Sequence, residues 1–275
     1  MNVPEELLDV RAVAFDVDGT LAGTDHRVTV RTLRALADLR AAGVEPIVIT
    51  GRILSEALAI FAGAGIDGHA VASNGAVAVD TRKTVPLHTA TLPEVEARAV
   101  VGFCDGRPIE PSLFTADAMV VPEGSLVYDL LREVNPDSTT LAVPRDALPY
   151  TSTMKAAIIG EPATLDALDG EIRAAFPRMT RSMDTVFDLS PSDADKWVAL
   201  QVVLADVGLD PAEVAGVGDG ENDLVWLSQV GFPVAMGNAR SAVRDLARLH
   251  IGHHGEEAVA ELVEALLAAR TARPA

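Results

Sequence analysis

The sequence predicts an α/β protein, with a doubly wound parallel sheet as its core and a smaller α/β module inserted in the middle of the chain. Hydrophobic residues make up 49% of the 275 residues but aromatic residues only 4%, so we expect a core of aliphatic strands covered by helices. A strand–helix–strand rhythm at both ends of the chain favours a parallel sheet. Between these ends the sequence pattern changes to several prolines with mixed helical and strand-like segments, which indicates the insertion.

The first strand–helix–strand unit lies within the first fifty residues. Apolar runs at residues 10–15 and 46–49 predict two buried strands. The first strand ends at Asp16 and the second at Thr50. Between them, residues 29–40 carry apolar side chains at helical spacing. The later core elements are a helix through about residue 62, a short strand at Val71, a turn at 73–75, a helix at 196–207, a strand at 214–217, a loop at 218–223 and helices through Leu267.

The insertion is expected between residues 85 and 184, with residues 1–84 and 185–275 forming the core. This middle stretch contains several prolines and a mixture of helical and strand-like segments. The helical segments are at residues 94–103 and 162–176, and a strand-like segment is at 155–159.

The charge of the chain restricts its partners. Lys and Arg total 22 against 40 Asp and Glu, a net charge of -18, which disfavours nucleic acid and anionic membranes as partners. No apolar run approaches the roughly 20 residues that a membrane-spanning helix needs, and no export signal is recognisable, so we expect a cytoplasmic protein. The sequence leaves the oligomeric state open between a monomer and a homodimer. Cys104 is the only cysteine, which excludes an intramolecular disulfide and is typical of a buried structural thiol.

The first chemically informative motif is Asp16-Val17-Asp18-Gly19-Thr20, directly after a predicted strand. Ligand sites of open parallel sheets lie at the carboxyl ends of strands. Residues two apart in extended backbone point to the same side, so Asp16 and Asp18 can address one substrate atom, one attacking and the other handling a proton. The alternative is an Asp-rich turn that only caps a helix.

A second acidic motif, Gly218-Asp219-Gly220-Glu221-Asn222-Asp223, also follows a predicted strand. Its oxygen ligands suit a hard dication such as Mg2+. The glycine spacing does not match a dinucleotide-binding loop, and the terminal Glu of an EF-hand is missing.

Thr50 and Lys196 are further candidates, at a strand end and at a helix start. The Thr50 hydroxyl and the Lys196 ammonium are groups that can bind a phosphoryl oxygen. The alternatives are a helix N-cap for Thr50 and a solvated surface charge for Lys196.

In their order along the chain, these four motifs resemble those of the haloacid dehalogenase superfamily, and specifically of its Cof-type phosphatases. Three further stretches are similar to secondary signatures of that branch, namely residues 73–76, 154–158 and 234–239. The resemblance implies a Rossmann-like core and an inserted cap that closes over the site.

The resemblance also implies a role for each motif residue. Asp16 would be the nucleophile that forms an aspartyl phosphate, and Asp18 the general acid and base. Mg2+ would be held by Asp16, the backbone carbonyl of Asp18 and Asp219, with Asp223 supporting these ligands. Thr50 and Lys196 would bind the transferring phosphoryl group. The residues expected to contact substrate are Thr50, Gly51, Arg52, Asn74, Lys196 and Asn222.

Two stretches depart from the family pattern. Residues 253–260 begin with His253-His254 where the family often has an Asn-rich segment, so substrate contacts there are in doubt. The two histidines invite a metal-site interpretation, but exposed loop histidines usually face solvent. Trp226 replaces a residue that is commonly Met and is expected to pack in the core.

The sequence thus predicts a Mg2+-dependent phosphatase that hydrolyses a phosphomonoester of a small metabolite, by default a sugar phosphate. The alternatives are a phosphomutase or phosphotransferase of the same superfamily, and a non-catalytic protein that only binds a phosphoryl group. The sequence does not identify the substrate or the cap residues that select it.

Overall fold

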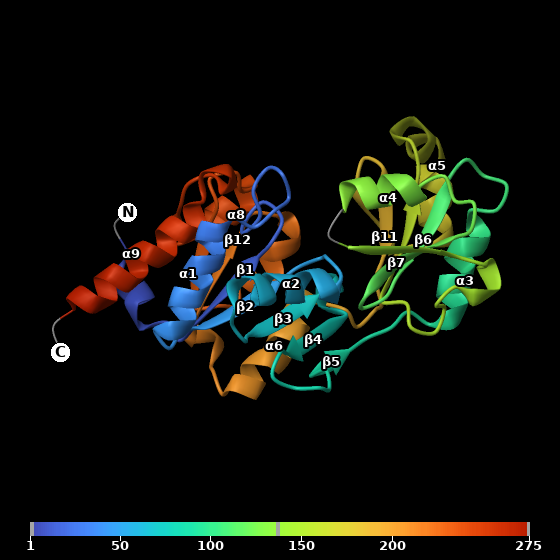
Figure 1. Cartoon of the computed structure of the whole chain (residues 1–275). Helices are drawn as coiled ribbons and strands as arrows, with labels where there is room; N and C mark the ends of the chain where they lie inside the picture. Colours follow the sequence, from blue (N-terminus) through green and yellow to red (C-terminus); the bar gives the residue numbers. More distant parts are fainter. Residues whose placement is uncertain (1–2, 136–137, 274–275) are drawn as a thin grey trace. The chain divides into compact units, whose positions relative to one another are not determined.

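The computed structural model describes residues 3–135 and 138–273, which fall into two compact units. The first unit comprises residues 1–51, 57–88 and 195–275, and the second comprises residues 52–56 and 89–194. The second unit is drawn mostly in green to yellow (Figure 1). No helix in the described ranges combines the length and the apolar character needed to cross a bilayer.

The first unit is built on a sheet with strand order β14-β13-β12-β1-β2-β3-β4-β5. Strands β14 to β3 of this order pair in parallel, and β4 runs antiparallel to β3. The strands are β1 (Ala12–Asp16), β2 (Glu45–Ile49), β3 (His69–Ala72), β4 (Val77–Asp80), β5 (His88–Thr89), β12 (Val214–Gly218), β13 (Phe232–Ala235) and β14 (Leu249–His250).

The central strands are continuously apolar because both of their faces are covered. All five residues of β1, β2 and β12 are buried. Helix α1 packs on β2 and α9, whereas α6 packs on β3, β4 and α7 (Figure 1). The helices are α1 (Val30–Ala41), α2 (Leu54–Ala64), α6 (Lys196–Val207), α7 (Leu224–Leu227), α8 (Ser241–Leu246) and α9 (Ala258–Ala272).

The second unit has its own sheet, with strand order β10-β11-β9-β6-β7-β8. Its pairs are antiparallel except for β7 and β8. Apolar side chains fill two clusters, one including Leu113, Ile158 and Phe187 and the other Phe114, Ala157 and Ile159. Its elements are α3 (Glu94–Phe103), β6 (Glu110–Phe114), β7 (Ala118–Pro122), α4 (Tyr128–Val134), β8 (Thr139–Val143), β9 (Lys155–Ile159), α5 (Pro162–Ala175), β10 (Thr180–Met183) and β11 (Val186–Leu189).

The structure divides the chain at different residues from those expected. A boundary at residue 184 would separate β10 from β11, which pair with each other, and β11 also pairs with β9. The second unit therefore continues to residue 194. It also takes in residues 52–56, since the backbone N–H of Ser55 donates to the Ala116 carbonyl.

Candidate active site

The sequence motifs meet at the carboxyl ends of β1, β2 and β12. Strand β1 lies between β2 and β12 in the sheet. The strands on the β2 side follow β1 directly in the chain, whereas β12 to β14 come last. The connections on either side of β1 therefore leave in opposite directions, which is the position where open α/β sheets bind ligands. Asp16 ends β1, Thr50 follows β2, and Asp219 follows β12.

Lys196 lies between two buried carboxylates. Its Nζ donates to Asp16 Oδ1 at 2.9 Å and to Asp223 Oδ1 at 2.8 Å. Asp16, Asp223 and Lys196 are 5%, 0% and 6% exposed, so these ion pairs are shielded from water. Lys196 is therefore a buried member of the site, which contradicts the alternative of a solvated surface charge.

The cluster has an excess of negative charge. Burial and the charge of Asp223 raise the pKa of Asp16 well above its usual value, although Lys196 opposes them. Burial by itself would lower the pKa of Lys196, but Asp16 and Asp223 outweigh it and hold the ammonium charged. Burial, followed by the charge of Asp223, raises the pKa of Asp219 to about 6.

The three carboxylates fit a divalent cation. Asp16, Asp219 and Asp223 each offer an oxygen, and these oxygens lie within 4.8 Å of one another. Among these four charged groups, Lys196 offsets only one of the three negative charges, so a dication would neutralise the remainder. An all-oxygen donor set is the one that Mg2+ prefers.

Asp223 is held by four donors. Its Oδ1 accepts from Lys196 and from the indole Nε1 of Trp226, at 2.8 and 3.0 Å. Its Oδ2 accepts from the backbone N–H groups of Asp219 and Gly220, at 3.3 and 3.0 Å. Together these four donors hold the Asp223 carboxylate in one orientation. Asp223 is therefore placed to orient Lys196 and the Asp219 loop.

Asn238 connects the loops that carry the first and the fourth motif. Its Nδ2 donates to Asp219 Oδ2 at 3.0 Å and to the Gly19 carbonyl at 2.8 Å. Gly19 has φ +82°, and a Cβ there would lie 2.4 Å from Asp219 Oδ2. Glycine is required at this position both for its backbone conformation and for the close approach of Asp219.

The start of α6 positions Lys196. Asp195 is the N-cap of this helix, and its Oδ1 accepts from the backbone N–H groups of Trp197 and Val198 at 2.7 and 3.1 Å. Gly75 packs directly against the cap, since a Cβ on Gly75 would lie 2.3 Å from the Asp195 carbonyl oxygen.

Thr50 and Asn74 lie beside each other, just after the neighbouring strands β2 and β3. Thr50 is fully buried, its N–H donates to the Val71 carbonyl, and its own carbonyl accepts from the N–H of Asn74. Asn74 has φ +57°, and a Cβ on Gly51 would lie 2.8 Å from its Oδ1. A left-handed Asn at a strand end is a sparsely populated conformation of the kind that clusters at functional sites.

The remaining candidates are outside this buried cluster. Asp18 is exposed, with Oδ1 3.7 Å from Nδ1 of His26. Asn222 is exposed in the short 3-10 helix Glu221–Asp223. Arg52 is in the second unit, where its Nε lies 3.7 Å from Glu56 Oε2.

The histidine loop differs from what was expected. His253 is exposed, but His254 is half-buried, and its Nδ1 donates to the Ala22 carbonyl at 2.8 Å. The backbone N–H of His254 donates to Asn238 Oδ1 at 3.1 Å. His254 therefore supports the loop that follows the first motif instead of facing only solvent.

The sequence patterns did not predict a role in the site for Asn238 or for the indole N–H of Trp226. Residues 234–239, which include Asn238, are similar to a signature of the family, and this similarity was the available sequence signal for Asn238. Trp226 is fully buried as expected, yet its N–H reaches Asp223. Its position three residues after Asp223, one turn along a helix, was the available signal.

The chain is similar to known proteins over most of its length. Residues 13–263 match the model of the haloacid dehalogenase-like hydrolase family. The phosphatase YwpJ of Bacillus subtilis (strain 168) is 26% identical, with 94% of this chain and 100% of that protein covered. The HMP-PP phosphatase of Serratia proteamaculans (strain 568) is 30% identical over 92% of this chain and 94% of its own length.

Solved structures share the fold. The crystal structure of a haloacid dehalogenase-like hydrolase from Bacteroides thetaiotaomicron superposes with a TM-score of 0.84 at 21% identity, covering 93% of this chain and 98% of that one. At this identity the likeness establishes the architecture alone.

Proposed function

The chain belongs to the haloacid dehalogenase-like hydrolases, as a Cof-type phosphatase that acts on phosphomonoesters, and we propose that it works through an aspartyl phosphate at Asp16. The observation that carries this proposal is the position of Asp16. It is a buried carboxylate at the end of the central strand, with Oδ1 held 2.9 Å from the Lys196 ammonium.

Asp16 is proposed as the nucleophile. With Oδ1 held by Lys196, we assign the attack on phosphorus to Oδ2. The attack forms the Asp16–phosphoryl bond and breaks the bond from phosphorus to the substrate oxygen. A water molecule then attacks the same phosphorus, which releases phosphate and regenerates the Asp16 carboxylate.

Asp18 is proposed to move the protons. Two residues beyond Asp16 and exposed to solvent, it can give its proton to the leaving alkoxide and later take one from the attacking water. Because Asp18 returns to its starting state, each cycle consumes one phosphate ester and one water and releases the alcohol and phosphate.

Lys196 and Thr50 are proposed to bind the transferring phosphoryl group. The buried ammonium offsets charge on the phosphoryl oxygens where water does not screen it, and the Thr50 hydroxyl donates to one of them. Asn74, Gly51, Arg52 and Asn222 remain candidates for substrate contact.

Mg2+ is the proposed cofactor, held by Asp16, Asp219 and the backbone carbonyl of Asp18, with Asp223 in support. When bound, it supplies positive charge that stabilises the phosphoryl oxygens during transfer. The high pKa of Asp16 supports this assignment, because a nearby dication would return the nucleophile to its ionised form.

The relatives named above suggest a small phosphorylated metabolite as substrate, and we take sugar phosphates as the first class to test. Phosphate release is measured from a panel of phosphorylated sugars, nucleotides and cofactors, with Mg2+ or with EDTA. We expect Mg2+-dependent release that Asp16→Asn abolishes, with Asp67→Asn, an exposed carboxylate away from the site, as the control. Transfer of phosphate to a second hydroxyl without release would identify a phosphotransferase instead.

A further inference from the structure

A second cluster of charged side chains lies at the other end of the first unit's parallel strands from Asp16. His69 begins β3 and Asp80 ends β4, and the two are directly paired in register. Asp206 reaches them from α6, which begins at Lys196. Ten residues of helix separate Lys196 from Asp206, or roughly 15 Å at 1.5 Å per residue. One helix thus contributes to two separate groups of charges.

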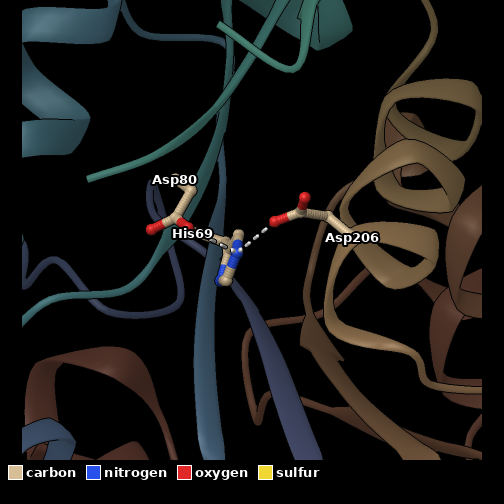
Figure 2. Close-up of side chains that lie close together, drawn as sticks. All are labelled: His69, Asp80 and Asp206. Atoms are coloured by element: carbon tan, nitrogen blue, oxygen red, sulfur yellow. Dashed lines mark hydrogen bonds and ion pairs between the residues drawn. The ribbon is translucent and has the colours of Figure 1, made fainter. Parts of the chain in front are cut away.

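The imidazole of His69 lies between two carboxylates, as Figure 2 shows. Its Nε2 is 3.4 Å from Asp206 Oδ2 and 3.8 Å from Asp80 Oδ2. His69 is fully buried, so water does not separate these groups. Tetrahedral coordination with bonds of about 2.1 Å places ligand atoms roughly 3.4 Å apart, close to the two spacings found here.

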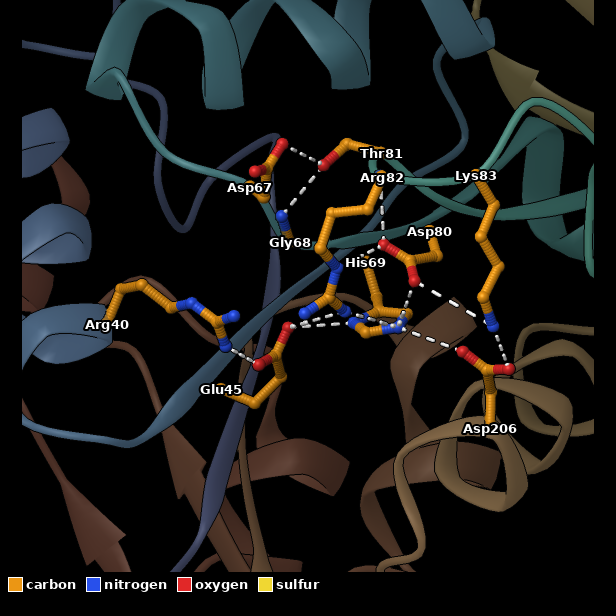
Figure 3. Close-up of polar contacts among 10 residues, drawn as sticks. All are labelled: Arg40, Glu45, Asp67, Gly68, His69, Asp80, Thr81, Arg82, Lys83 and Asp206. Carbon is orange, nitrogen blue, oxygen red and sulfur yellow. Dashed lines mark hydrogen bonds and ion pairs between the residues drawn. The ribbon is translucent and has the colours of Figure 1, made fainter.

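Glu45 fixes the tautomer of His69. Its Oε1 is 2.8 Å from Nδ1 (Figure 3). An ionised carboxylate only accepts, so the hydrogen is on Nδ1 and the Nε2 lone pair points toward the two aspartates. A histidine that donates one ring N–H to a carboxylate and presents the other nitrogen is the usual arrangement around a bound metal.

In Asp80 and in Asp206, the two carboxylate oxygens contact different partners. Asp80 Oδ1 accepts from Arg82 Nε at 2.6 Å, and Asp206 Oδ1 accepts from Lys83. The Oδ2 atom of each is the oxygen that faces His69. Arg82 Nη2 also lies 3.4 Å from Nε2, and Lys83 Nζ lies 3.8 Å from Asp80 Oδ2, so a bound cation would compete with both (Figure 3).

We propose that His69 Nε2, Asp80 Oδ2 and Asp206 Oδ2 form a binding site for a divalent transition metal, with Zn2+ as the representative ion. One nitrogen and two carboxylate oxygens suit such a metal better than Mg2+, which prefers oxygen alone. The site is distinct from the acidic cluster at Asp16 in both position and ligand type. A metal there joins β3, β4 and α6, and stabilises the folded first unit.

The test measures Zn2+ binding and does not depend on catalytic activity. Equilibrium dialysis is carried out on Asp16→Asn/Asp219→Asn, in which two of the three acidic residues at the active site have lost their charge. We expect one Zn2+ per chain, visible absorption bands with Co2+ as a substitute, and a thermal midpoint that rises with Zn2+.

Further variants in the same background identify the ligands. Asp206→Asn, at a partly exposed position, should fold and weaken Zn2+ binding at least tenfold. Glu45→Gln should weaken it about 10- to 100-fold through the orientation of His69. Lys83→Gln should tighten it, because a competing ammonium is removed. Asp67→Asn is the control, since this exposed carboxylate contacts Thr81 and should leave the affinity unchanged.

Two results would overturn the proposal. One is the absence of Zn2+ binding in the starting background, and the other is Zn2+ binding that Asp206→Asn leaves intact. Either would identify the cluster as a closed network of ion pairs that only fastens α6 to the sheet.

Discussion

At the scale of single residues, the site depends on one buried cation shared by two buried carboxylates. Lys196 contacts both Asp16 and Asp223, so its removal leaves two buried carboxylates without the ammonium that they share. Breaking a buried pair is far more costly than losing an exposed one, because the remaining charge stays out of water.

We predict that Lys196→Met lowers kcat by at least about 100-fold and the free energy of unfolding by about 3 kcal/mol. Arg11→Met is the matched control, because Arg11 pairs with Glu213 at the surface and its loss should cost at most about 1 kcal/mol. Steady-state kinetics and urea denaturation measure both quantities. Equal stability losses in the two variants would contradict the buried pairing.

A second residue-scale prediction concerns Gly19 and Gly43, which have similar positive φ values of +82° and +78°. Alanine at either position should cost about 1 to 2 kcal/mol through backbone strain. Only at Gly19 would the new Cβ meet Asp219, at 2.4 Å, whereas nothing lies within 4 Å at Gly43. Gly19→Ala should therefore lose most activity while Gly43→Ala keeps it. Similar activity in the two folded variants would show that the approach of Gly19 to Asp219 is unimportant.

The residue types in the site were predictable from the sequence, but many of their contacts were not. Asp16, Asp219, Asp223 and Lys196 were expected together, and the structure brings them together. The contacts of Asn238 depend on how distant loops approach one another, which local sequence patterns do not encode.

At the scale of secondary structure, α6 is the element that delivers Lys196. Its N-cap, Asp195, is bonded to the first turn and immediately precedes the lysine. Fraying of that turn would therefore displace the ammonium.

We predict that Asp195→Ala costs about 1 kcal/mol of stability and also lowers kcat. Asp210→Ala removes a comparable cap from the 3-10 helix Pro211–Glu213, away from the site, and should cost stability without changing kcat. Unfolding and kinetic measurements on both variants separate the two effects. An unchanged kcat in Asp195→Ala would mean that the cap does not position Lys196.

Several helices and strands were predicted with their bounds, but two strands near the end of the chain were missed. The helices at residues 94–103 and 196–207 and the strand at 155–159 have the predicted bounds. Strands β13 and β14 were not anticipated. The first contains an internal Pro233, which disfavours a strand, and the second has only two residues, too few for a period to be recognised.

At the scale of the whole molecule, the division into units was predicted in outline but not in its boundaries. Pairing of β11 with β9 and β10 decides where the second unit ends. The pairing of β11 with β9 joins segments separated by α5, and local sequence patterns do not reveal it.

The single cysteine provides a pH-dependent signal of folding. Burial raises the pKa of Cys104 from 9.0 to about 12, so the folded protein binds its proton more tightly than the unfolded chain does. A raised folded pKa means that stability is present below pH 9 and is lost as the pH rises toward 12.

We predict that stability falls by about 1 kcal/mol per pH unit above pH 9 because of this thiol, and that Cys104→Ala removes that component of the slope. Urea unfolding at several pH values, compared between the two proteins, measures the difference. Identical slopes would show that the thiol titrates in the folded state as it does when exposed.

Trapping of the phosphorylated enzyme tests whether Asp16 is the nucleophile. An aryl phosphate needs no proton on its leaving group, so Asp18→Asn should carry out the first step and stall at the second. With Mg2+, this variant should release one equivalent of phenolate in a burst, and acid quenching should leave one phosphoryl group on the peptide that contains Asp16. No burst, or a phosphoryl group attached elsewhere, would contradict the proposed role of Asp16.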